Sequence, residues 1–212
     1  MARIKEVLEY ESKYTVDDIL INLKGINNQA ELEKEERKES TKKLMALYLM
    51  GITGNFDAEH YYGIHKYIFE DFYPFAGKVR NENIYKSFSF CLPQYIDSML
   101  KDTLKHAKID AEKIQNEEDL ISFLAYYYSE LDVIHPFREG NGRTLREFLR
   151  QYVLKINQMI DFGEYEIDYN QIDDRDKFIQ AVELADVRGD IDNLKEIFKN
   201  CLVNHMEKKH VR

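Results

Sequence analysis

A short run in the middle of the chain, residues 135–146, combines residue types that could carry out chemistry on a nucleotide. It holds a histidine, a glutamate and a Gly-Asn-Gly turn, with two arginines, Arg143 and Arg146, after the turn. A lone glycine turn, a histidine before proline, or arginines on a helix face each have ordinary structural explanations. Their combination in this order is what favours a binding site for a phosphate-containing ligand.

The Gly-Asn-Gly segment predicts an anion-binding turn at the start of a helix. Gly140 and Gly142 can adopt positive φ at little steric cost, and Asn141 tolerates the left-handed region, so successive N–H groups could face one point. The positive end of the following helix would also attract phosphate. Apolar residues at helical spacing define that helix: Leu145, Phe148, Leu149, Tyr152, Val153 and Ile156.

Three arginines, Arg143, Arg146 and Arg150, fall at i, i+3 and i+7 of the predicted helix. Like charges at such spacings repel by about 0.2–0.5 kcal/mol per pair. The first two also lie in the opening turn, where the helix dipole disfavours cations. A polyphosphate would remove both penalties, and guanidinium groups bind phosphate oxygens in a bidentate manner. A solvated stripe is the ordinary alternative.

His135 and Glu139 are the candidate base and metal ligand. Because His135 precedes a proline, the helix before it should end there and present the imidazole. An unperturbed histidine has a pKa of ~6.5, so a neutral ring could accept a proton from a hydroxyl at neutral pH. The Glu139 carboxylate could hold Mg²⁺ while phosphate oxygens and waters complete the coordination shell. Phe137 is expected to be a core anchor.

This run resembles the Fic family, also called Fic/Doc, whose motif reads His-x-Phe-x-Asp/Glu-Gly-Asn-Gly-Arg-x-x-Arg. The chain matches every specified position. The resemblance extends upstream through residues 56–60 and 64–80, and covers roughly residues 50–160. It implies a Fic-type helical fold and the transfer of AMP from ATP to a Ser, Thr or Tyr hydroxyl of a target protein, with release of pyrophosphate.

The resemblance also implies a role for each motif residue. His135 would be the base and Glu139 the Mg²⁺ ligand. The anion hole would be lined by Gly140, Asn141 and Gly142, and the β and γ phosphates would be bound by Arg143 and Arg146. These roles agree with the residue chemistry, because nucleotidyl transfer depends mostly on positioning and charge neutralisation.

Other activities occur on the same scaffold. In the Doc branch, which phosphorylates its targets, lysine replaces the second glycine of the anion hole, whereas this chain has Gly142 there. AMP transfer is therefore favoured over a Fic-fold kinase, while phosphocholine and UMP transfer are compatible with the motif. A nucleotide-binding interaction module without transfer activity is a further alternative, although a pure binder has no need of a base.

The segment from Val79 to Leu92 alternates imperfectly and predicts a short β-hairpin. In Fic proteins the matching segment is a flap that aligns the target by strand addition, a known mode of peptide binding. Lys86, Phe88 and Phe90 are therefore candidate flap residues. Aromatic side chains filling the edge of the core would explain the pattern equally well.

Regulation is where the chain departs from much of the family. Many Fic proteins are inhibited by a helix bearing Ser/Thr-x-x-x-Glu-Gly/Asn, whose glutamate pairs with the second motif arginine. No Ser or Thr of this chain has Glu four residues later; the nearest variant runs from Asn27 to Glu31 and is followed by Leu32. We expect inhibition by a separate small antitoxin-like protein or by a degenerate element involving Glu31.

Composition predicts a mostly α-helical chain in one compact unit. Only 3 prolines and 9 glycines interrupt 212 residues, of which 44 % are hydrophobic. We expect an N-terminal helical region, residues 1–50, packed on a catalytic domain, residues 51–212. Helical patterns are expected over 16–50 with a break near Gly25, over 57–72 and 120–134, after Pro93, and near 170–185 and 191–206.

Several classes of protein are disfavoured. A net charge of −9 argues against broad binding to nucleic acid or anionic membranes. No run approaches the ~18 apolar residues of a membrane span, and the start of the chain lacks a signal peptide. The two cysteines and the five-residue spacing of His60 and His65 suggest neither a disulfide framework nor a zinc site. We expect a cytoplasmic protein; a leaderless secreted effector would look the same.

Overall fold

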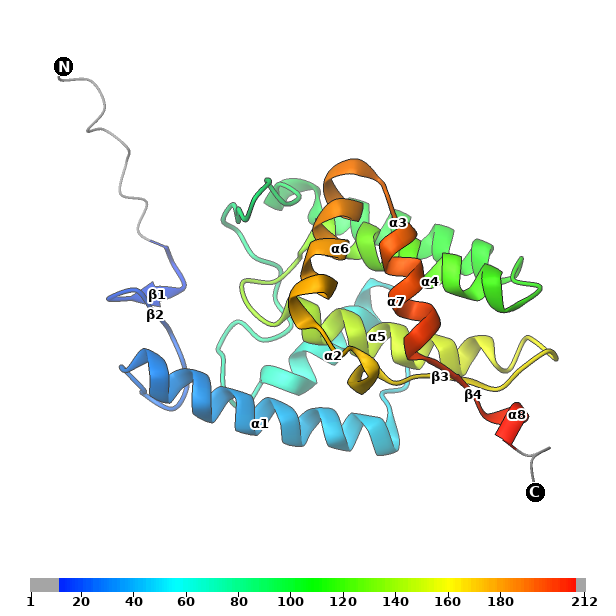
Figure 1. The fold of residues 1–212 in the computed structure, drawn as a ribbon. Helices are drawn as coiled ribbons and strands as arrows, with labels where there is room; N and C mark the ends of the chain where they lie inside the picture. The colour runs from blue at the N-terminus through cyan, green and yellow to red at the C-terminus, as the bar shows by residue number, and fades with distance from the viewer. Residues whose placement is uncertain (1–11, 209–212) are drawn as a thin grey trace, which may run out of the picture.

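The computed structural model describes residues 12–208, which form a bundle of α-helices with two small antiparallel strand pairs (Figure 1). The mostly helical class predicted from composition is confirmed. The helices are α1 (Gln29–Met50), α2 (Ala58–Phe69), α3 (Ile96–Ala111), α4 (Glu117–Ile134), α5 (Asn141–Ile156), α6 (Arg175–Arg188), α7 (Asp192–Cys201) and α8 (His205–Lys208). Short 3-10 turns, Pro93–Tyr95 and Tyr169–Gln171, precede α3 and α6.

The two helices that flank the motif, α4 and α5, form the centre of the bundle. α4 contacts α3, α5, α6 and α7, while α5 contacts α2 as well as α4. Apolar residues recur on α4 at the three- and four-residue spacing of a helix face, and Leu120, Leu124 and Leu131 are buried. Because both helices are embedded in the core, the loop between them is held from several sides.

Local sequence sets both ends of α4. The Asn116 side chain accepts a hydrogen bond from the backbone N–H of Asp119 at 2.9 Å, and the first turn is acidic, which stabilises a helix N-terminus. The helix ends at Ile134, because His135 takes a left-handed conformation with φ of 46° and Pro136 follows. The predicted helix end at His135 is confirmed.

The prediction of a helical region over residues 16–50 is partly wrong. Residues 16–28 contain no helix; instead the strands β1 (Thr15–Val16) and β2 (Ile19–Leu20) form a two-residue hairpin. Asp17 and Asp18, at its turn, have φ of 50° and 62°, the left-handed conformation that such tight turns require and that aspartate tolerates. The helical pattern is real only from α1 onwards, where Asn28 caps the helix.

The C-terminal helix is shorter than predicted. α7 ends at Cys201, and Leu202–Asn204 (β4) pairs antiparallel with Tyr165–Ile167 (β3). The side chains of Tyr165 and Ile167 are buried, so the pairing covers a strand that packs on the core. The strand partner of β4 is β3, which lies far away in the sequence. Helical periodicity cannot reveal such a partner, so the sequence predicts a helix that continues past Cys201.

The predicted hairpin over residues 79–92 is a loop closed by one antiparallel bridge, between Tyr85 and Ser89. Two backbone hydrogen bonds support it, from the N–H of Lys86 to the Phe88 carbonyl at 3.0 Å and from the N–H of Phe90 to the Ile84 carbonyl at 3.2 Å. Residues 81–92 are called the flap loop below. Among residues 12–208, no helix is both long enough and apolar enough to cross a membrane.

Candidate active site

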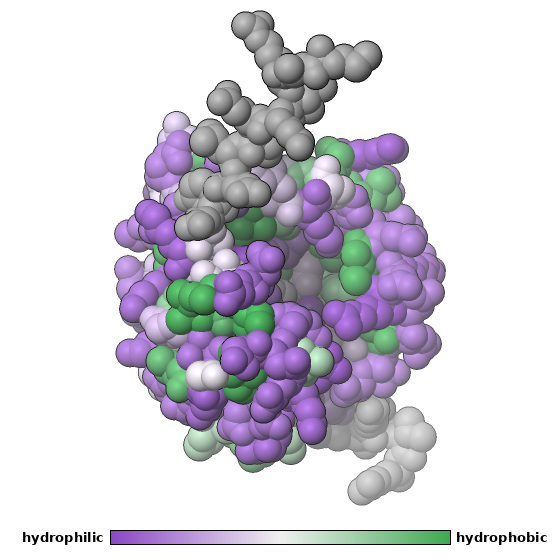
Figure 2. Space-filling model, turned by 90° about the vertical axis from the view of Figure 1, so that its left-hand side faces the viewer, coloured by the Kyte–Doolittle hydropathy of each residue, from purple (hydrophilic) through white to green (hydrophobic). Residues whose placement is uncertain are grey.

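A cleft of about 850 Å³ opens between α1, the flap loop and the N-terminus of α5. Figure 2 faces the side of the molecule on which these elements lie in Figure 1, and shows a recess near the middle of a largely hydrophilic surface. The volume is that of a small-molecule site. The cleft is lined by all the motif residues to which a role was assigned: His135, Glu139, Gly140, Asn141, Gly142, Arg143 and Arg146.

The imidazole of His135 is fixed in one orientation. Its Nδ1 lies 3.2 Å from the backbone carbonyl oxygen of Asp132, which can only accept a hydrogen bond. The neutral ring therefore carries its proton on Nδ1 and leaves Nε2 unprotonated. The Phe90 ring stacks on the imidazole, with centroids 3.9 Å apart and an angle of 19° between planes. This is the arrangement that a general base needs.

A buried arginine, Arg80, holds the chain at His135. Its Nε donates to the carbonyl oxygen of His135 at 2.7 Å, and its terminal nitrogens donate to the carbonyls of Glu82 and Cys91, both at 2.6 Å. Its backbone N–H donates to the Pro136 carbonyl at 2.9 Å. Arg80 therefore ties the end of α4 to the flap loop, a role that its sequence position alone does not reveal.

The glycine turn differs in detail from its prediction. Gly140 has φ of 84°, but Asn141 and Gly142 are already the first residues of α5, with ordinary helical backbone. The Asn141 side chain closes the turn, accepting from the Phe137 N–H and donating to the Phe137 carbonyl, both at 2.8 Å. The candidate anion site is thus the N-terminus of α5, which has no side-chain cap.

The two glycines, Gly140 and Gly142, have different structural roles. A Cβ at Gly140 would lie 2.3 Å from the Phe69 ring, in addition to the unfavourable φ. A Cβ at Gly142 would lie 3.2 Å from a terminal nitrogen of Arg146, so glycine there leaves room beside the guanidinium. Glycine at residue 142 therefore provides room for the Arg146 side chain and is not needed for the backbone conformation.

Glu139 faces the cleft from the turn. Its carboxylate accepts from the N–H of Gly140 at 2.9 Å and lies 3.3 Å from a terminal nitrogen of Arg143, while 43 % of the side chain is exposed. Its carbonyl oxygen is held by Nε2 of the buried His65 at 2.9 Å. Nδ1 of that ring accepts from the Gly77 N–H, and burial lowers the pKa of His65 to about 3, so the ring is neutral.

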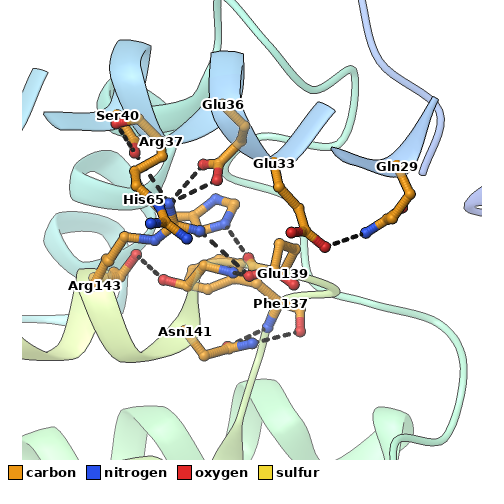
Figure 3. Close-up of polar contacts among 12 residues, drawn as sticks. Gln29, Glu33, Glu36, Arg37, Ser40, His65, Phe137, Glu139, Asn141 and Arg143 are labelled. Atoms are coloured by element: carbon orange, nitrogen blue, oxygen red, sulfur yellow. Dashed lines mark hydrogen bonds and ion pairs between the residues drawn. The ribbon is translucent and has the colours of Figure 1, made fainter. Parts of the chain in front are cut away.

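Arg143 is engaged by α1. One terminal nitrogen donates to both carboxylate oxygens of Glu36, at 2.6 and 2.8 Å, and to the Ser40 hydroxyl at 3.0 Å. The guanidinium also lies over the Phe69 ring, 4.8 Å from its centroid. Figure 3 shows Glu36 and Ser40 reaching Arg143 from the same helix. Of the two motif arginines, the first therefore already has a carboxylate partner.

The other two arginines of α5, Arg146 and Arg150, lie in different surroundings. Arg146 lines the cleft and pairs with no carboxylate among the described residues. Arg150 is buried against Glu147, at 2.8 Å, and donates to the Leu47 carbonyl at 3.2 Å. The hypothesis that all three arginines surround one polyphosphate is wrong for Arg150. Its position at i+7 keeps it on the same face as Arg143 but two turns further along α5, where it meets the end of α1.

The candidate flap residues also occupy different places. Lys86 and Phe90 line the cleft, whereas Phe88 packs on the Phe90 ring with centroids 4.8 Å apart. Glu31, the proposed regulatory residue, lies exposed in the first turn of α1, where its N–H bonds the Asn28 cap, and it does not line the cleft.

A second cavity of about 410 Å³ adjoins the cleft behind His135. The two share Lys86, Phe90, His135, Gly142, Arg146 and Arg175. Much of its remaining wall is apolar or aromatic, from α4, α6 and the turn between β3 and α6: Tyr128, Tyr169, Ile172, Phe178, Ile179 and Val182. The second cavity therefore combines an apolar and aromatic wall with charged side chains, Asp132 among them, and it meets the cleft at the histidine.

The whole fold is shared with a solved Fic structure. The BepC protein of Bartonella tribocorum, with bound AMPPNP, superimposes with a TM-score of 0.76 over 91 % of this chain and 97 % of that chain, at 20 % sequence identity. This likeness shows that the chain has the fold of a Fic domain.

Sequence comparisons point to the same family as the fold does. The chain is 37 % identical over 150 residues to protein adenylyltransferase VbhT of Bartonella schoenbuchensis, a match that spans 70 % of this chain and 31 % of that protein. It is 25 % identical over 187 residues, 87 % of this chain and 88 % of the relative, to the Escherichia coli protein named Probable protein adenylyltransferase Fic. Residues 55–153 match the model of the Fic/DOC family. The chain belongs to the Fic/DOC family.

Proposed function

We propose that this chain is a Mg²⁺-dependent protein adenylyltransferase, which transfers AMP from ATP to a Ser, Thr or Tyr hydroxyl of a target protein. The observation that carries the proposal is that one cleft joins His135, with Nδ1 occupied, to the uncapped N-terminus of α5. The names of VbhT and of the Escherichia coli relative, and the nucleotide analogue bound to BepC, support the same activity.

The phosphates of ATP would lie at the start of α5. Backbone N–H groups and the helix dipole favour an anion there, and no side chain caps this helix. Arg146 is available for the β or γ phosphate, and Arg143 becomes available once Glu36 releases it. The oxygens of the α-phosphate, next to His135, would accept hydrogen bonds from these N–H groups. The hydrogen bonds would stabilise the negative charge that increases on the oxygens during the reaction.

The adenine base would occupy the second cavity. One wall of this cavity consists of aromatic and aliphatic side chains, which suit a stacked base. The Tyr169 hydroxyl is buried and has no hydrogen-bond partner among the described residues, so it is free to bond a nucleoside. Substituting Ile179 by Trp should fill this cavity and weaken ATP binding without altering the phosphate site; unchanged ATP affinity would contradict this placement.

In the reaction, Nε2 of His135 accepts the proton of the target hydroxyl. The hydroxyl oxygen forms a bond to the α-phosphorus, the bond from that phosphorus to the bridging oxygen breaks, and pyrophosphate leaves with the electron pair. The base and the anion site lie on opposite sides of one short turn, residues 135–141, so both can touch the same phosphoryl group.

Glu139 would hold the Mg²⁺ ion. Its carboxylate is partly exposed and faces the cleft, and a single protein carboxylate suffices where substrate phosphates and waters supply the other ligands. A bound ion would neutralise charge on the phosphates. The residues present therefore fit this metal.

The target would be aligned by the flap loop. Lys86 and Phe90 border the cleft, and Tyr85 is exposed beside them, so an extended segment could lie along the loop above His135. Strand addition uses mainly backbone groups, which suits a loop with a single internal bridge. Ser87→Pro should reduce target labelling while leaving ATP binding intact; unaltered labelling would contradict this role.

A separate antitoxin-like inhibitor is retained as part of the proposal. Arg146, the second motif arginine, has no carboxylate partner within residues 12–208 and is open to one from another protein. The free cysteines Cys91 and Cys201 suit a reducing compartment such as the cytoplasm. Co-purification with a small protein whose removal activates transfer is expected; a chain that is inactive by itself would argue against it.

The test is transfer of label from ATP to protein. Label on the α-phosphate should appear on a target and vanish in His135→Ala, whereas label on the γ-phosphate should not transfer. His106→Ala is the matched control, because that ring lies exposed on α3. Label arriving from the γ-phosphate would indicate a kinase, and ATP binding without any transfer would indicate an interaction module.

A further inference from the structure

A carboxyl group, that of Asp132, lies beside the candidate catalytic histidine and interacts with a second carboxyl group, that of Asp186. Asp132 is in the last turn of α4, and its Oδ1 is 3.7 Å from Nδ1 of His135. Asp186 is in the last turn of α6 and accepts a hydrogen bond from the Ser129 hydroxyl at 2.8 Å. The two carboxyl groups interact through a hydrogen bond, which two ionised carboxylates could not form.

The pair has little compensation for its charge. The Asp132 side chain is only 13 % exposed, and within residues 12–208 its sole salt-bridge partner is His135. Burial, followed by the charge of Asp132, raises the pKa of Asp186 to about 8, so at neutral pH the pair retains one proton. A shared proton leaves a single negative charge, which faces the imidazole.

The surroundings of the pair are mixed in charge. Lys86 contributes a positive charge near Asp186 from the flap loop. Tyr61 on α2 and Tyr128 on α4 interact electrostatically with Asp132, and Tyr128 also with Asp186. Arg146 on α5 and Arg175 on α6 line the same cavity as Asp132. None of these is within salt-bridge distance of either carboxyl in the described part of the chain.

We propose that Asp132 and Asp186 share one proton and act as a unit that orients His135 and stabilises its protonated form during AMP transfer. Asp132 and Asp186 are positioning residues, because they act through His135 and not on the reacting atoms. This inference rests on the proposed function.

The chemistry follows from the geometry. When Nε2 takes the proton of the target hydroxyl, the ring becomes a cation with N–H groups on both nitrogens. The Asp132 carbonyl accepts from Nδ1, and its carboxylate lies behind the same nitrogen. A negative charge there favours the cation, as the buried aspartate does in a Ser-His-Asp triad. The proton on Asp186 is not consumed; it limits the pair to one charge.

Asparagine substitutions distinguish the roles of the two carboxyl groups. Asp132→Asn removes the charge that faces the histidine but keeps the backbone carbonyl and the side-chain shape. Asp186→Asn keeps an oxygen for Ser129 and removes the carboxyl that shares its proton with Asp132. Asp102→Asn is the control, because Asp102 lies 3.6 Å from Nδ1 of His106 in an exposed pair on α3.

The expected results differ among these variants. Asp132→Asn should lower kcat at least about 10-fold at unchanged KM for ATP, the scale of a lost general-base partner. The acidic limb of its pH–rate profile should move to lower pH by about 1 to 3 units, the usual effect of a neighbouring charge. Asp186→Asn should retain kcat within about 3-fold. Equal effects of both substitutions, or a wild-type profile in Asp132→Asn, would overturn the inference.

A second measurement does not depend on transfer. In ¹⁵N NMR, the pH at which the His135 ring nitrogens change shift should fall in Asp132→Asn by the amount seen in the acidic limb, and stay the same in Asp102→Asn. Absence of transfer in the wild type would refute the proposed function, while the ring signals would still decide the role of the pair. Ring signals that respond identically in all three proteins would overturn it.

Discussion

The carboxylate of Glu36 holds Arg143 through both of its oxygens, at 2.6 and 2.8 Å, although 107 residues separate the two in sequence. Glu36 is one of the few buried polar residues of α1, together with Ser40, which bonds the same guanidinium. An acidic side chain therefore occupies the place where a phosphate would meet the first motif arginine.

Replacing Glu36 by alanine should strengthen ATP binding. The ion pair is partly exposed, so its loss should release Arg143 at a gain of about 1 kcal/mol, or roughly 5-fold in Kd. Isothermal titration calorimetry with ATP measures this directly. Glu33→Ala is the matched control, since Glu33 also lines the cleft but accepts its hydrogen bond from Gln29. Weaker binding in Glu36→Ala would mean that the carboxylate positions the arginine rather than blocks it.

Alanine should be tolerated at Gly142 and not at Gly140. Gly140→Ala combines φ of 84° with a Cβ placed 2.3 Å from Phe69, so a loss of about 2–5 kcal/mol in the free energy of unfolding is expected. Gly142→Ala lies in helical backbone and should be neutral or stabilising by up to about 1 kcal/mol. Its Cβ crowds Arg146, so ATP affinity should fall instead. Urea denaturation and ATP titration separate the two effects; similar unfolding free energies would contradict the assignment.

Lysine cannot replace Arg80. A guanidinium reaches the carbonyls of Glu82, Cys91 and His135 together, and an ammonium cannot match that planar fork. Arg80→Lys should destabilise the fold by about 2–4 kcal/mol, because buried carbonyls lose their donors. It should also lower kcat by releasing the His135 backbone. Thermal unfolding and kcat check both; Lys78→Arg, at an exposed lysine nearby, is the control.

Stability should depend on pH through Asp186. Because burial and Asp132 raise its pKa to about 8, the folded chain binds this proton more tightly than the unfolded chain does. The contribution is therefore fully present below the ordinary carboxyl pKa of ~3.9 and is lost progressively as the pH rises through about 8. Asp186→Asn should flatten this part of the curve of unfolding free energy against pH. A wild-type slope in that variant would refute the assignment.

Much of the fold was predictable because its determinants are local. The apolar spacing of α4 and α5, the caps and the proline after His135 lie within one or two helical turns of the residues they affect. The errors arose where distant pairing overrides local pattern. Leu202–Asn204 leaves the helix because Tyr165–Ile167 offers a strand partner, and the segment before Asn28 forms a hairpin.

The sequence by itself determined the motif and its chemistry: a base, a carboxylate, a glycine turn and arginines adjacent along the chain must lie near one another. Only the tertiary structure decided what each of them meets. It placed Glu36 on Arg143, Arg80 on the His135 carbonyl and the Asp132 carboxyl beside the imidazole, where it interacts with Asp186. These contacts join helices and loops far apart in the chain, and they exist only because burying the apolar faces of those helices brings their polar residues together.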